Sequence, residues 1–232
     1  KMRKKTLVFT ATYNESENIE EFLNSTIKLH DVDVLIIDDN SPDETSKIIE
    51  KYQSDYKNLF LIKRPGKLGL DTAHKEGYDF ALENNYKNLI TLDADLSHDP
   101  SQIPSFIKIL NNNAFVIGSR YITGGKNKTK LSRLILSYLG NKLIKLIFNM
   151  NCNEYTTSYR GFNLNLLKNF EIKEVKSKGY SFFMETIYHI HKSGNFIKEV
   201  PIVFSDRKKG ISKIPKIETF RTLKNLILLK IK

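Results

Sequence analysis

The sequence has almost no cysteine, and it has no long apolar run. Cys152 is the one thiol among 232 residues, which excludes an internal disulfide and a cysteine-based zinc site and favours a reducing compartment. No apolar run approaches the roughly 18 residues of a membrane-spanning helix. The apolar stretch after residues 1–5 is also too short for a signal peptide. We therefore expect a cytoplasmic location.

The chain also lacks internal repeats, low-complexity linkers and an excess of acidic residues. With 40% hydrophobic residues, its length suits one α/β domain with a full core. The 37 Lys and Arg exceed the 26 Asp and Glu and leave a net charge of +11, which favours nucleic acid, an anionic lipid surface or phosphorylated substrates. Because no known nucleic-acid-binding motif is present, we expect no nucleic acid partner.

Two carboxylates, Asp93 and Asp95, follow the apolar run 89–92. Such a run is typical of a buried strand, and ligands of open α/β sheets lie outside the carboxyl ends of strands. Both carboxylates could therefore bind one Mg²⁺ or Mn²⁺ ion, with substrate phosphates completing its coordination shell. A lone Asp-x-Asp is more often a solvated strand end, in which Asp forms the turn.

Apolar runs alternate with helical patterns through the first half of the chain. The runs 6–12, 34–39, 58–62 and 115–120 join 89–92 as expected strands. Helices are expected between them, including 71–84 and 101–110. This repeated βα pattern predicts an α/β fold with a mostly parallel central sheet flanked by helices.

The second half has a different texture. Residues 131–148 form a helix pattern with a wide apolar arc interleaved with Arg133, Lys142 and Lys145. Such a helix could lie in the core with snorkelling lysines, or it could lie in a membrane interface. The remaining expected elements are a polar turn at 156–162, a helix at 179–191, a late strand at 196–204 that Pro201 marks as an edge, and an amphipathic basic tail at 214–232.

Seven short motifs occur in the same order as in the family 2 glycosyltransferases. They are Thr12-Tyr13-Asn14-Glu15, Ile37 to Asp43, Leu68-Gly69-Leu70, Asp93 to His98, Gly118 to Tyr121, Ser158-Tyr159-Arg160, and Asp206-Arg207 with Gly210 to Lys213. Over nearly its whole length the chain resembles the catalytic domain of a dolichol- or polyprenyl-phosphate mannosyltransferase.

The resemblance implies one domain over 1–232 with the Rossmann-like, nucleotide-sugar-binding glycosyltransferase A fold and amphipathic interface helices. Residues from about 1 to 120 would form the nucleotide-sugar-binding half. Those from about 121 to 213 would form the acceptor half with a basic loop, and 214–232 would form the tail. The tail's apolar pattern is unfinished at Lys232, and relatives often continue into membrane helices, so we expect a membrane-anchoring segment or subunit.

The resemblance also implies site residues for a nucleotide-sugar donor such as GDP-mannose and for a polyprenyl phosphate acceptor. The metal ligands would be Asp93 and Asp95, which with Arg120, Arg207 and Lys213 would form the catalytic set. Donor contacts would come from Thr12, Tyr13, Glu15, Asp39, Asp71, Ala94, Asp95, Arg207 and Lys213. Acceptor contacts would come from Ser97, His98, Arg120 and Arg160.

Some positions depart from the family pattern. Asp71 stands where relatives commonly have Gly, and Glu154 with Thr156 stands near where they usually carry Asp. We expect these departures to affect which sugar is transferred. Asp71 directly follows the loop Leu68-Gly69-Leu70, which the resemblance places near the nucleotide, and could select another donor such as UDP-glucose.

An acceptor phosphate also affects the expected mechanism. With a second pKa of about 6, a phosphate monoester is already ionised at pH 7 and needs no strong base. Direct displacement with inversion follows, with metal and basic side chains stabilising the leaving diphosphate. A hydroxyl acceptor in polysaccharide or glycolipid synthesis would instead need a base such as Glu154 or Asp71. A non-catalytic membrane-surface scaffold is a third alternative.

A lipid acceptor requires contact with a bilayer. The segments 131–148 and 219–232 combine apolar and basic residues, which suits helices resting on an anionic surface. We expect peripheral attachment to the cytoplasmic face of a membrane. Arg133, Lys142 and Lys145 would draw the lipid phosphate towards Arg120 and Arg160.

Overall fold

Seven strands form one sheet in the computed structural model, which describes residues 4–207, 209 and 225. The strand order is β3-β2-β1-β4-β7-β5-β8, and every neighbouring pair is parallel except those of β7, which runs antiparallel to β4 and β5. The strands are β1 (Lys4–Thr12), β2 (Val32–Asp38), β3 (Leu59–Lys63), β4 (Tyr86–Thr91), β5 (Phe115–Ser119), β7 (Arg160–Asn163) and β8 (Ile197–Pro201).

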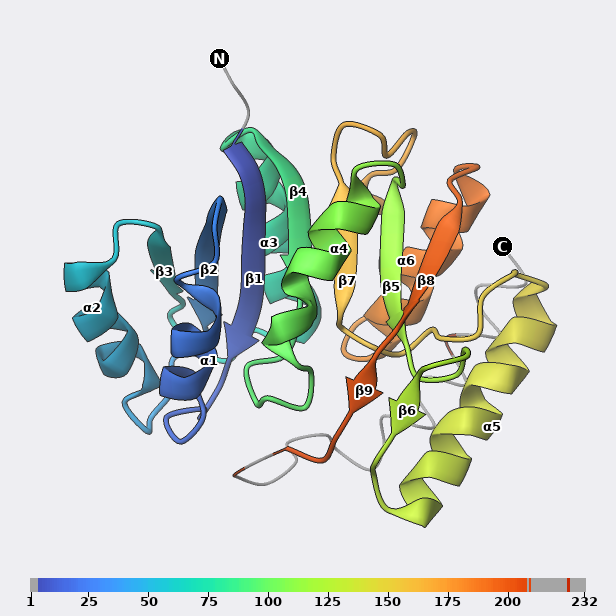
Figure 1. Cartoon of the computed structure of the whole chain (residues 1–232), viewed down its shortest axis with the longest axis horizontal. Helices are drawn as coiled ribbons and strands as arrows, with labels where there is room; N and C mark the ends of the chain where they lie inside the picture. Colours follow the sequence, from blue (N-terminus) through green and yellow to red (C-terminus); the bar gives the residue numbers. More distant parts are fainter. Residues whose placement is uncertain (1–3, 208, 210–224, 226–232) are drawn as a thin grey trace.

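Helices cover both faces of the sheet (Figure 1). The helices α1 (Ile19–Thr26), α2 (Thr45–Asp55) and α4 (Ile103–Leu110) lie on one face, and α3 (Leu70–Glu83) and α6 (Ser181–Lys192) lie on the other. The α/β expectation of a mostly parallel, helix-flanked sheet is confirmed. The remaining elements are α5 (Leu131–Phe148), the short strands β6 (Lys126–Asn127) and β9 (Val203–Phe204), and the 3₁₀ turns at Pro100–Gln102 and Ile172–Glu174.

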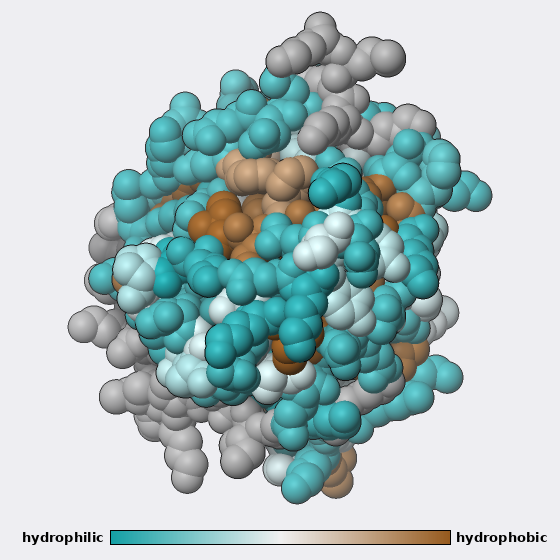
Figure 2. All heavy atoms as spheres, turned by 90° about the vertical axis from the view of Figure 1, so that its left-hand side faces the viewer, coloured by the Kyte–Doolittle hydropathy of each residue, from teal (hydrophilic) through white to brown (hydrophobic). Residues whose placement is uncertain are grey.

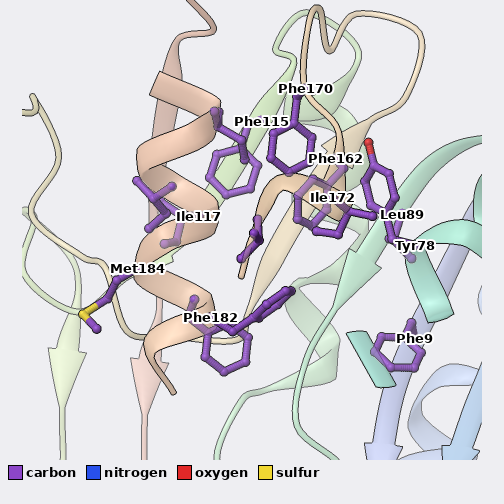
Figure 3. Close-up of a cluster of buried hydrophobic side chains, with 14 of the residues drawn as sticks. Phe9, Tyr78, Leu89, Phe115, Ile117, Phe162, Phe170, Ile172, Phe182 and Met184 are labelled. Carbon is purple, nitrogen blue, oxygen red and sulfur yellow. The ribbon is translucent and has the colours of Figure 1, made fainter. Parts of the chain in front are cut away.

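The core has two layers because the apolar strands are buried on both faces. One layer packs α1, α2 and α4 against β1, β2 and β4. The other layer is aromatic, and Figure 3 shows side chains of β5, β7 and α3 gathered beside α6. Within it Phe162 makes edge contacts with Phe115 and Tyr78, at ring-centre distances of 5.0 and 5.6 Å.

The strands β7 and β8 test two predictions for the second half of the chain, the polar turn at 156–162 and the edge position of Pro201. The turn predicted over 156–162 is wrong at its end, because Arg160–Asn163 forms β7 between β4 and β5. The strand's tight packing needs Gly161, where a Cβ would lie 2.8 Å from Leu110 Cδ1 of α4. The edge position of Pro201 is confirmed, since β8 is the last strand of the sheet.

Helix α5 stands apart from the sheet (Figure 1) and buries few side chains, among them Asn141 and Ile144. Most exposed large hydrophobic side chains of the described residues belong to it: Leu131, Ile135, Leu136, Tyr138, Leu139, Leu143 and Leu146. By contrast, the face at the β3 side of the molecule is mostly hydrophilic (Figure 2). Of the two alternatives for this helix, burial in the core is therefore wrong. No helix within the described ranges is both long and apolar enough to cross a bilayer.

The aromatic layer leads to a stability prediction. Replacing the fully buried Phe115 by Ala removes its contacts with Phe162 and leaves a cavity, so we expect the free energy of unfolding to fall by about 3 to 5 kcal/mol. Phe196→Ala is the matched control, because Phe196 is 65% exposed and its loss should change stability by about 0.5 kcal/mol or less. Urea denaturation measures both, and equal losses would contradict the proposed importance of the aromatic layer.

Candidate active site

Three neighbouring strands end at the same edge of the sheet and bring their polar ends together. Thr12 closes β1, Asp39 follows β2, and Asp93 lies just beyond β4. The strand order changes direction at β1, since β2 lies on one side of it and β4 on the other. This is the switch point at which open α/β sheets bind ligands.

A cavity of about 190 Å³, the β1–β2 cavity, opens at this edge. Of the expected donor contacts, it is lined by Thr12, Tyr13, Glu15, Asp39, Ala94, Asp95 and Arg207. Lys67 also lines it, and its Nζ lies 3.9 Å from the centre of the Tyr13 ring. The cavity thus combines an aromatic face, carboxylates and cations.

Asp39 is fixed by a buried ion pair with Arg64, whose Nη1 lies 2.6 Å from Asp39 Oδ1. The backbone N–H of Gly69 donates to the other carboxylate oxygen at 3.1 Å. Arg64 in turn donates to the carbonyl of Gly69 and to Thr72. These contacts tie the glycine-bearing loop to the end of β2 and hold the Asp39 carboxylate in one orientation.

The two carboxylates beyond β4 differ in their partners. Asp95 accepts the N–H of Ser97 and lies 3.1 Å from Arg207 Nη2. Asp93 accepts the hydroxyl of Ser158 at 2.6 Å, and 41% of its side chain is exposed. Desolvation by the surrounding protein and the negative charge of Asp95 raise the pKa of Asp93. Two carboxylates are therefore held together against their repulsion.

A second cavity of about 270 Å³, the α5 cavity, lies beside the first and shares Asp93, Asp95, Tyr180 and Arg207 with it. Helix α5 contributes Arg133 and Ser137 to its wall. Of the expected acceptor contacts it contains Ser97, His98 and Arg120. The Ser97 hydroxyl is buried and has no hydrogen-bond partner in the described part of the chain.

Arg120 is held by a two-pronged pair with Glu154, at 2.7 Å from Nε to Oε2 and 2.8 Å from Nη2 to Oε1. Burial disfavours both charges, but each partner outweighs this effect, so that the pKa of Arg120 is raised and that of Glu154 is lowered. Glu154 is fully buried. Its carboxylate fixes the Arg120 side chain and is poorly placed to act as a base.

His98 is a buried support of the site. Its Nδ1 accepts the backbone N–H of Asp93 at 3.4 Å, and its Nε2 lies 3.0 Å from Thr157 Oγ1. Burial lowers the pKa of His98 to about 4, so that the ring is neutral at pH 7. Its contacts position the Asp93 segment.

Arg160 lies elsewhere than the resemblance implied. It is fully buried, donates to the carbonyls of Thr157 and Tyr155, and stacks on Phe183. It does not line the α5 cavity. Because it lies on β7, its side chain points into the aromatic layer, where it supports the loop that carries Thr156 to Ser158.

Other expected residues are also separated from the cavities. Asp71 does not line the β1–β2 cavity, and its Oδ1 accepts the N–H of Gly179 at 3.0 Å. Lys142 and Lys145 line a separate hollow of about 290 Å³, whereas Arg133 lines the α5 cavity. Lys213, Gly210 and the tail 214–232, apart from residue 225, lie outside the described residues.

Tyr180, Arg64 and Lys67 are among the site residues that the sequence reasoning missed. Tyr180 follows a glycine and directly precedes α6, and Arg64 follows β3. A cation just after a strand and a Gly-aromatic pair just before a helix were the available signals.

The carboxylate oxygens of Asp93 and Asp95 are suitable ligands for a divalent cation. Asp93 and Asp95 provide the hard oxygen ligands that Mg²⁺ and Mn²⁺ prefer, and a cation would offset the negative charge of Asp95, which together with desolvation raises the pKa of Asp93. Within the described ranges no group of three or more His, Cys, Asp or Glu suits a metal ion. Two carboxylates beside cavities that could hold phosphates match the usual coordination of Mg²⁺, with substrate oxygens completing the shell.

Comparisons with known proteins identify the family of the chain. The chain matches the family described as Glycosyl transferase family 2 over residues 7–170. It is 31% identical to a polyprenol monophosphomannose synthase of Mycolicibacterium smegmatis over 90% of this chain and 81% of that protein. It is 32% identical to an undecaprenyl-phosphate mannosyltransferase of Micrococcus luteus over 90% of this chain and 86% of that protein.

A solved structure extends the comparison to the fold. It is a mannosyltransferase of Pyrobaculum calidifontis in complex with GDP-Man and Mn²⁺, with a TM-score of 0.57 and 18% identity. The match covers 90% of this chain and 59% of that one, so this chain spans about three fifths of that protein. Together with the shared edge of β2, β1 and β4, these matches confirm the resemblance read from the motifs: the chain belongs to the family 2 glycosyltransferases.

Proposed function

We propose that this protein transfers mannose from GDP-mannose to a polyprenyl phosphate, with inversion and with Mg²⁺ or Mn²⁺, at the cytoplasmic face of a membrane. The observation that carries the proposal is the junction of the two cavities at Asp93 and Asp95. The β1–β2 cavity would hold the nucleotide and its diphosphate, and the α5 cavity would hold the acceptor phosphate. The names of both bacterial relatives support the sugar and the lipid.

The polar lining of the α5 cavity supports a phosphate acceptor. Arg120, Arg133 and Arg207 line it, and arginine is well suited to bind phosphate oxygens. The carboxylates that could activate a hydroxyl are both occupied, Glu154 by Arg120 and Asp71 by Gly179. An acceptor that is already ionised needs no such base.

The chain's own residues would act on charge and orientation. Asp39 and the loop that Arg64 holds would orient the nucleoside, and Asp93 with Asp95 would bind the cation. The bound cation would neutralise charge on the departing diphosphate. Arg207 lies where it can contact the same diphosphate, and Arg120 and Arg133 would align the acceptor phosphate for attack on the opposite side of the anomeric carbon.

The exposed side of α5 supports peripheral binding to an anionic bilayer. Its leucines would insert among acyl chains, while Lys142, Lys145 and Arg133 would meet the headgroups. Each basic residue near such a surface contributes about 1 kcal/mol. The α5 cavity opens beside this helix, so a lipid phosphate could enter it from the membrane surface.

Transfer assays test the proposal. We expect radiolabelled mannose to pass from GDP-mannose to undecaprenyl phosphate, and we expect UDP-glucose or a water-soluble hydroxyl acceptor to give little product. Transfer to the hydroxyl acceptor at an equal rate would contradict a phosphate-specific site.

Removal of the metal or of its ligands is a separate test. EDTA, Asp93→Ala and Asp95→Ala should each abolish transfer, because the charge of the diphosphate is then unopposed. Asp55→Ala, at an exposed residue of α2, should leave transfer unchanged. Near-normal turnover in EDTA would rule out the metal.

Arg207 provides a second test. Arg207→Ala should lower kcat/KM by about one to three powers of ten, the usual scale for a lost contact to charge that develops in the transition state. Lys108→Ala removes the same charge from the exposed side of α4 and is the control. An unchanged kcat/KM in Arg207→Ala would refute the contact.

Membrane binding is tested on α5. Leu139→Glu and Leu146→Glu place a carboxylate on its exposed side, so both should reduce co-sedimentation with phosphatidylcholine vesicles that contain phosphatidylglycerol. Leu82→Glu, at an exposed leucine of α3, is the matched control. Added salt should weaken the binding of the unaltered chain. If all three variants bind alike, α5 is not the membrane contact.

A further inference from the structure

Within the described part of the chain, Tyr180 is the one aromatic side chain that lines both cavities. It stands with Asp93, Asp95 and Arg207 at their junction, at the N-cap position just before α6. Among the described residues, none forms a hydrogen bond with its hydroxyl, whereas most polar groups of the site are paired. Burial and the charges of Asp93 and Asp95 raise the pKa of Tyr180, so the phenol stays neutral and can donate a hydrogen bond.

The backbone before Tyr180 is fixed by a residue far away in sequence. Gly179 adopts a left-handed conformation with φ of 60°, and its N–H donates to Asp71 Oδ1 at 3.0 Å. Asp71 belongs to the first turn of α3 and is buried. A glycine at position 71 could not accept this bond.

The same turn of α3 belongs to the floor of the β1–β2 cavity. Gly69 precedes α3, its N–H donates to Asp39, and both Gly69 and Leu70 line the cavity. Asp71 therefore connects the loop that orients Asp39 with the residue that stands at the cavity junction. Its carboxylate accepts the Gly179 N–H and does not line the cavity.

We propose that Tyr180 contacts the sugar that is transferred between the two cavities, and that Asp71 is its positioning residue through the N–H of Gly179. This inference rests on the proposed function, because the transferred group must lie between a diphosphate in one cavity and a phosphate in the other. The phenol hydroxyl would donate to a sugar hydroxyl or to the bridging phosphate oxygen.

Kinetics of single and double variants test the proposal. Tyr180→Phe should lower kcat/KM about tenfold through the loss of one hydrogen bond near charge. Asp71→Ala should cause a similar loss, mainly in kcat, and the double variant should lose no more than the worse single variant, since both act on one contact. Fully additive losses, or wild-type rates in either single variant, would overturn the proposal.

The conservative variant separates position from charge. Asp71→Asn keeps an oxygen that can accept the Gly179 N–H, so its kcat/KM should stay within about threefold of the unaltered chain. Asp79→Asn removes a charge from the same helix and is the control. If Asp71→Asn falls as far as Asp71→Ala, or if Asp71→Ala changes the preferred donor, Asp71 acts by charge or selectivity and the proposal fails.

Two measurements work even if no donor in the panel is transferred. Amide hydrogen exchange of the peptide containing Gly179 should be faster in Asp71→Ala than in Asp79→Asn, and equal exchange would contradict the positioning bond. The chain has no tryptophan, so Tyr180→Trp places a single tryptophan at the junction, which can be excited selectively above the absorption of the tyrosines. Its emission should change on addition of GDP with Mn²⁺, and this change should shrink when Asp71→Ala is added. Loss of transfer with these signals intact would reject the proposed reaction only, and absent signals would reject the inference.

Discussion

The repulsion between Asp93 and Asp95 is the interaction on which the rest of the site depends. Both carboxylates lie just beyond a buried strand, and desolvation together with the negative charge of Asp95 raises the pKa of Asp93. The surroundings hold them in place: Ser158 donates to Asp93, Arg207 faces Asp95, and His98 accepts the backbone N–H of Asp93. In the proposed function a cation bound by the two acids would offset their negative charge at the point where both cavities meet.

The three arginines that line the α5 cavity differ in how tightly they are paired with carboxylates. Arg120 is paired with a fully buried glutamate, which cancels most of its charge and fixes its geometry. Arg133 and Arg207 have exposed portions and pair with Asp206 and Asp95 at longer distances of 3.3 and 3.1 Å. The cavity therefore combines a tightly paired arginine with two that are more loosely paired, and under the proposed function these two could exchange their carboxylate partners for an acceptor phosphate.

Much of the fold could be predicted from the sequence because buried parallel strands are continuous apolar runs. The strand β7 could not, since Arg160, Gly161 and Asn163 show no apolar alternation, and its pairing is decided by β4 and β5. The motifs predicted most cavity residues, yet the side of β7 on which Arg160 lies depends on that pairing. Arg64 and Tyr180 escaped prediction because their roles depend on Asp39 and Asp71, which are distant in sequence.

The exposed side of helix α5 would determine how the protein encounters a lipid substrate. The exposed leucines and the lysines of α5 lie on a helix that stands apart from the sheet. The α5 cavity, which Arg133 lines, lies beside this helix. A protein lying on a bilayer through such a helix meets a lipid by lateral diffusion in two dimensions. Saturation would then follow the mole fraction of acceptor in the membrane, and diluting the vesicles at constant composition would leave the rate per bound enzyme unchanged.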